Sequence, residues 1–105
     1  MENKYAVIMV ACANKTEAKK IAELLVNMRL AACVQMMPIE SVYVWQNEVC
    51  SGSEVLLLVK SKANLFDKIA ETITKHHSYD VPEIVQVPII NGLPSYLSWI
   101  DDCVD

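Results

Sequence analysis

Glycine and proline are scarce in this sequence, whose 105 residues include only 2 Gly and 4 Pro. Because these residues mark most turns, their scarcity predicts few loops and long regular elements. The length is close to the commonest domain size, so we expect a single domain that spans residues 1–105. A composition of 53% hydrophobic and 21% charged residues is typical of a folded protein and excludes a disordered chain.

Basic residues and long apolar runs are lacking as well. The chain has 9 Lys and Arg against 13 Asp and Glu, which gives a net charge of -4. Nucleic-acid binding depends on clustered Lys and Arg, so we expect no nucleic-acid partner. No stretch approaches the roughly 20 apolar residues that a membrane span needs, so we expect no membrane association. The apolar run at 6–11 is too short for a signal peptide and predicts a first strand.

The cysteines lack the close spacing of a structural zinc site. Cys12, Cys33, Cys50 and Cys103 form no CxxC pair. Cys12, Cys33 and Cys103 have mainly apolar neighbours, which favours reduced thiols in the protein interior. We therefore expect a reducing, cytoplasmic location.

The sequence does contain a clear order of helix and strand patterns. Asn14 and Glu17 have the spacing of a helix capping box, and Gln46 and Asn47 mark a tight turn between two long strands. The main helices are predicted at 15–29 and 62–77, the strands at 6–11, 32–46, 48–60 and 83–90, and a short C-terminal helix from Pro94. This βαββαβ order predicts an α+β fold, a ferredoxin-like sandwich with both main helices on one face of an antiparallel sheet.

The two long strands predict a hairpin that projects beyond the domain. Such a strand reaches about 45 Å, whereas a compact chain of this length has a diameter of only about 33 Å. One subunit cannot cover all the apolar side chains on this arm, which include Val42, Val44, Trp45 and Val49. Exposed apolar patches and free strand edges mark interfaces, so we expect a homo-oligomer.

Five segments together form a pattern that extends over most of the chain. They are "LAACV" at 30–34, "YVWQNEV" at 43–49, "SEVLLLVKS" at 53–61, "HHSYDVPEI" at 76–84 and "GLPSYLSWI" at 92–100. In this order they resemble the CutA family of divalent-cation tolerance proteins. The resemblance implies a cytoplasmic homotrimer of ferredoxin-like subunits, similar in assembly to the PII signalling proteins and linked to tolerance of copper and other divalent ions.

The same resemblance implies a metal site. In family members with two adjacent histidines, that pair and a cysteine at the end of the first strand have been proposed to bind copper. The matching residues here are Cys12, His76 and His77. The chain departs from the family at Ser78, where a proline usually follows the second histidine. Without the proline the helix end can adopt other backbone geometries, which affects the orientation of His77.

The donor types suit a metal, but each residue also has a simpler interpretation. Imidazole and thiolate together suit copper(I) or zinc, and imidazole alone suits copper(II). Neighbouring residues on a helix point about 100° apart, so both rings can bind one ion only if the helix ends there or a second subunit contributes. His77 continues the apolar stripe of the second helix, His76 suits a helix C-terminus, and Cys12 has the surroundings of a packing residue.

Acidic and aromatic residues near the histidines leave two interpretations open. Tyr79, Asp80 and Glu83 are placed to orient an imidazole. Asp80 equally suits the cap of the turn before Pro82, and we favour that role.

Three functions compete on the sequence alone. The first is a trimeric metal-binding protein that catalyses no reaction and uses copper or another divalent ion such as zinc, with no organic cofactor. The second is a PII-like sensor or scaffold that binds a small ligand or a partner protein at clefts between subunits. The third is an enzyme with Cys12 as nucleophile and His77 as base, which we disfavour because no third catalytic residue and no glycine-rich anion loop accompany them.

Overall fold

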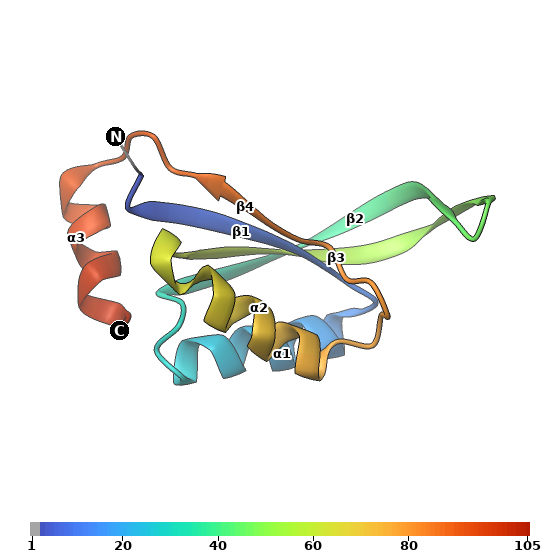
Figure 1. Cartoon of the computed structure of the whole chain (residues 1–105), viewed down its shortest axis with the longest axis horizontal. Coiled ribbons are helices and arrows are strands. Elements are labelled where there is room, and N and C mark those ends of the chain that lie inside the picture. Colours follow the sequence, from blue (N-terminus) through green and yellow to red (C-terminus); the bar gives the residue numbers. More distant parts are fainter. Residues whose placement is uncertain (1–2) are drawn as a thin grey trace.

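Four antiparallel strands form one sheet in the order β2-β3-β1-β4 in the computed structural model, which describes residues 3–105. The elements are β1 (Tyr5–Cys12), α1 (Lys15–Asn27), β2 (Cys33–Trp45), β3 (Glu48–Lys62), a 3₁₀ turn (Ala63–Leu65), α2 (Phe66–His76), β4 (Ile84–Pro88) and α3 (Pro94–Cys103). Helices α1 and α2 lie on the same face of the sheet (Figure 1). The predicted α+β, ferredoxin-like fold is confirmed.

The end of α2 differs from the prediction. The apolar periodicity placed His77 inside the helix, but the helix ends at His76 and His77 is extended, with φ of −94° and ψ of 142°. The two histidine rings therefore belong to different backbone conformations. This break turns the chain back toward the start of α1, where the candidate site lies.

The core lies between the sheet and helices α1 and α2. Because side chains alternate across a strand, Ile8 and Val10 of β1 face the helices together with Leu57 and Val59 of β3. They pack against the buried stripe of α1, which consists of Ala18, Ile21, Ala22 and Leu25. Among the described residues, no helix is both long and apolar enough to span a membrane.

Helix α1 begins with the predicted cap at Asn14, although the Glu17 carboxylate bonds to the residue before the cap and not to the cap residue itself. The Asn14 side chain accepts a hydrogen bond from the Glu17 N–H at 2.9 Å, and the Glu17 carboxylate accepts one from the Ala13 N–H at 3.1 Å. These bonds satisfy backbone donors that have no partner within the helix. They also fix the Glu17 side chain at the end of β1.

Substitution of Asn14 by alanine is expected to lower the free energy of unfolding by about 1 kcal/mol, because the Glu17 N–H loses its acceptor. Urea denaturation measures the loss. Asn14→Ser, which keeps an acceptor at the cap, is the matched control and should stay closer to wild type. Equal stability of Asn14→Ala and wild type would contradict the capping role.

The predicted arm is present. Strands β2 and β3 pair without interruption from Cys33 opposite Lys60 to Trp45 opposite Glu48. Gln46 and Asn47 have positive φ values of 50° and 65°, as the tight turn of a two-residue hairpin requires. The hairpin extends past the helices and gives the molecule a long dimension of 44 Å (Figure 1).

The face of the sheet opposite α1 and α2 is apolar and largely open. Val7 lies opposite Val87, and Met9 lies between Val85 and Leu58, so these residues share that face. Val85 and Val87 are 50% and 43% exposed. Helix α3 lies at one end of the sheet (Figure 1), where the Tyr5 hydroxyl of β1 donates a hydrogen bond to Asp101 of α3.

Candidate metal centre

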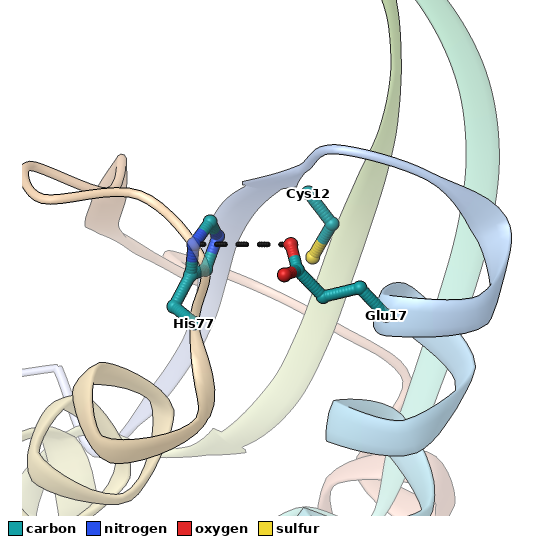
Figure 2. A group of neighbouring side chains, drawn as sticks. All are labelled: Cys12, Glu17 and His77. Carbon is teal, nitrogen blue, oxygen red and sulfur yellow. Dashed lines mark ion pairs between the residues drawn. The ribbon is translucent and has the colours of Figure 1, made fainter.

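Cys12, Glu17 and His77 come together from three different elements. Cys12 ends β1, Glu17 lies in the first turn of α1, and His77 follows the last residue of α2. One ligand atom from each side chain lies within 4.8 Å of the others, and Figure 2 shows the imidazole and the carboxylate facing each other beside the sulfur. All three residue types are common ligands of transition metals.

The His77 imidazole is held in one orientation by hydrogen bonds to both nitrogens. Its side chain is fully buried. Nε2 lies 2.8 Å from the Ala11 carbonyl oxygen, which can only accept, so Nε2 carries the hydrogen. Nδ1 accepts from the Tyr79 N–H at 3.1 Å. The neutral tautomer inferred from these partners leaves a lone pair on Nδ1, which lies 3.8 Å from Glu17 Oε1.

The Glu17 carboxylate links the start of α1 to the segment after α2. One oxygen accepts from the Ala13 N–H, and the other accepts from the Ser78 N–H at 3.0 Å. Burial acts to raise the pKa of Glu17, but hydrogen bonds from Ser78 and Ala13 outweigh it and hold the pKa below its usual value. Glu17 is therefore negatively charged at neutral pH. A proline at position 78 would have no N–H to donate to it.

The Cys12 thiol is buried and protonated at neutral pH. Its residue has no exposed surface. Burial raises the pKa of Cys12 to about 12, and the negative charges of Glu17 and Glu54 act in the same direction. Any process that uses the Cys12 thiolate must first remove this proton.

His76 lies outside this group. It is exposed at the last position of α2, and its Nδ1 lies 2.9 Å from the Thr72 carbonyl oxygen of the same helix. The structure thus brings together two of the three predicted metal ligands, Cys12 and His77, and adds Glu17, which sequence reasoning identified only as a capping residue. That all three predicted residues bind one ion stays a prediction.

Tyr79 connects the site to a cleft beside the arm. Its ring centroid lies 4.8 Å from that of His77, and its hydroxyl donates to Glu54 Oε2 at 2.8 Å. The cleft has a volume of about 840 Å³ and lies between residues 40–45 of β2 and residues 79–83 of the loop before β4. Its acidic lining residues are Glu40, Glu54, Asp80 and Glu83. The Tyr79 backbone N–H contacts Nδ1 of His77, whereas the sequence interpretation placed such a contact at the second ring nitrogen, the one that binds no metal.

Comparisons with known proteins agree on one family. The family model described as CutA1 divalent ion tolerance protein matches residues 6–103. A Thermus thermophilus protein named divalent-cation tolerance protein CutA is 43% identical over 95 residues, a match that covers 90% of this chain and 92% of that protein. A solved structure described as the periplasmic divalent cation tolerance protein CutA from Archaeoglobus fulgidus has a TM-score of 0.94 and 33% identity, covering 96% of this chain and 99% of that one.

Some relatives are longer. The chloroplastic CutA protein of Arabidopsis thaliana is 42% identical over 95 residues, which are 90% of this chain but 52% of that protein. A chloroplastic CutA 1 protein of rice is matched over 54% of its length. The chain therefore spans about half the length of these plant relatives.

Proposed function

The chain belongs to the CutA1 family of divalent ion tolerance proteins, and from this premise we propose that it binds a transition metal ion, copper or zinc, without catalysing a reaction. The observation that carries the proposal is the buried pair Cys12 and His77, which lie beside each other at the end of the sheet where α1 begins and α2 ends. A thiolate and an imidazole are donors that copper(I) and zinc prefer.

Metal affinity is expected to increase about tenfold for each pH unit between about pH 6 and 8. Each bound ion must displace the Cys12 proton, and a thiol with a pKa of about 12 remains protonated throughout this range. Calorimetry in buffers of different ionisation enthalpy measures both the affinity and the released proton.

The control for this experiment is Cys12→Ala. Without the thiol, the protein should bind metal at least about a hundredfold more weakly and lose the proton release. A wild-type protein that binds no copper or zinc, or that binds them with no pH dependence, would count against the proposal.

The active form in this proposal is a homotrimer. The open apolar face of the sheet and the arm support self-association, since Val42, Val44 and Val49 of the arm are 70–78% exposed. The proposed location is the cytoplasm, where the cysteines, none of which is in a disulfide, would stay reduced.

A second candidate function, a PII-like sensor or scaffold, is favoured by the cleft beside the arm. Its acidic lining disfavours a phosphate-bearing ligand and suits a cationic one. Truncation of residues 43–50 should abolish ligand or partner binding in that case. Chelators and the His76→Ala variant should leave it intact.

Thiol catalysis has less support. A nucleophilic cysteine ordinarily has a pKa below the free value of about 8.5, whereas burial raises that of Cys12 to about 12. We therefore propose no catalytic residue and no organic cofactor.

A further inference from the structure

We propose that Glu17, and not His76, is the third protein ligand, and that Cys12, Glu17 and His77 form a zinc site. This inference rests on the proposed function, because it names the ligands and the ion for a protein proposed to bind metal. Three features of the site carry it: the tautomer of His77, the charge of the donor set and the position of His76.

His77 already has the hydrogen-bond arrangement of a metal ligand. Metal-bound histidines almost always donate their second ring N–H to a carboxylate, a backbone carbonyl or water. Here Nε2 lies 2.8 Å from the Ala11 carbonyl oxygen, so the lone pair is on Nδ1. Nδ1 is the nitrogen that lies 3.8 Å from Glu17 Oε1, and Figure 2 shows the sulfur of Cys12 beside that carboxylate.

The distances require only a small contraction. With zinc bonds of about 2.0–2.3 Å, the ligand atoms of a tetrahedral site lie about 3.3–3.8 Å apart. The three ligand atoms here lie within 4.8 Å of one another. An ion would take over the Nδ1 lone pair from the Tyr79 N–H and would compete with the Ser78 and Ala13 N–H groups for Glu17.

Charge balance selects the ion. The Glu17 side chain is only 13% exposed and those of Cys12 and His77 are buried, so a net charge at this position is costly. One thiolate, one carboxylate and one neutral imidazole neutralise Zn²⁺. The same donors around Cu⁺ would leave a net negative charge, and carboxylate oxygen is a poor donor for that soft ion. A Cys, His and His set would leave an uncompensated positive charge around Zn²⁺.

His76 has neither the position nor the orientation of a ligand in this subunit. It is exposed, and its Nδ1 is in contact with the Thr72 carbonyl of its own helix. Glu17 instead reaches the site directly, because its hydrogen bond from the Ala13 N–H holds its carboxylate at the end of β1.

The test is a titration of the full chain with Zn²⁺, and with Co²⁺ as a spectroscopic probe, for wild type, Glu17→Gln, His76→Ala and His77→Ala. We expect Glu17→Gln and His77→Ala to weaken Zn²⁺ binding at least about tenfold and His76→Ala to leave it unchanged. The Co²⁺ spectrum of wild type should show thiolate charge transfer and the intense bands of a tetrahedral site. Glu17→Gln should shift those bands, which a purely structural role of Glu17 would not do.

The outcomes separate this inference from the proposed function. If wild type binds Zn²⁺ but Glu17→Gln binds it equally well, Glu17 is not a ligand. If His76→Ala weakens binding as much as His77→Ala, the exclusion of His76 is wrong. In both cases the protein remains a metal binder. If wild type binds neither Zn²⁺ nor copper, the proposed function and this inference both fail. Should Glu17→Gln fold poorly, the His76→Ala titration and the wild-type Co²⁺ spectrum still decide the question.

Discussion

Substitution of His77 by alanine is expected to lower the free energy of unfolding of the metal-free protein by about 3 kcal/mol. The side chain is fully buried, so its removal leaves a cavity next to Cys12 and Glu17. It also leaves the Ala11 carbonyl and the Tyr79 N–H without their partners. An unsatisfied buried polar group costs about 1–3 kcal/mol, and the cavity adds to that loss.

His76→Ala is the matched control for this experiment. The two histidines are neighbours of identical chemistry, but His76 is exposed at the end of α2 and its substitution should cost less than about 1 kcal/mol. Urea denaturation in the presence of a chelator measures both variants, at one fixed protein concentration, because self-association would contribute to stability. If His77→Ala proves as stable as His76→Ala, the two hydrogen bonds of His77 do not contribute to the stability of the fold.

A structural role for His77 does not exclude a metal-binding one. The same hydrogen bond to the Ala11 carbonyl that stabilises the metal-free fold also fixes the tautomer with a lone pair on Nδ1. A metal ion would then replace one weak contact, the Tyr79 N–H, and leave the stronger anchor in place. The site would be preorganised without depending on metal for folding.

Local patterns in the sequence predict the fold well because each element carries its own signal. The capping box at Asn14 and Glu17, the 3.6-residue periodicity of the helices and the turn at Gln46 and Asn47 all depend on neighbouring residues. The projecting arm follows from strand length alone. The end of α2 was missed because the apolar periodicity continues to His77, and periodicity does not show where backbone hydrogen bonding stops.

The site is less predictable because its ligands are distant in sequence. Family resemblance pointed to Cys12 and His77, and the fold places them together. The sequence explains Glu17 fully as a capping residue, so no pattern in the sequence indicates that it is also a metal ligand. Its contact with the Ser78 N–H, 61 residues away, depends on how α2 packs against α1.

The largest expected effect concerns self-association. The Val85→Asp/Val87→Asp double variant is expected to weaken formation of the proposed trimer more than about a thousandfold. Both side chains lie on the face of the sheet away from α1 and α2, where they join Val7 and Met9 in an apolar surface. An unpaired carboxylate buried in an interface costs several kcal/mol, and threefold symmetry would impose each substitution three times.

Sedimentation velocity at micromolar concentration measures this effect, with circular dichroism to check that the variant is folded. Val26→Asp is the matched control, because Val26 on the opposite, helical layer is 43% exposed, as is Val87. Both variants make the chain, which already has a net charge of -4, more acidic. General charge repulsion would therefore weaken both assemblies, whereas loss of a specific interface would affect only the variant on the open face. A double variant that sediments like wild type would show that this face is not part of an interface. A monomeric wild-type protein would contradict the proposed trimer.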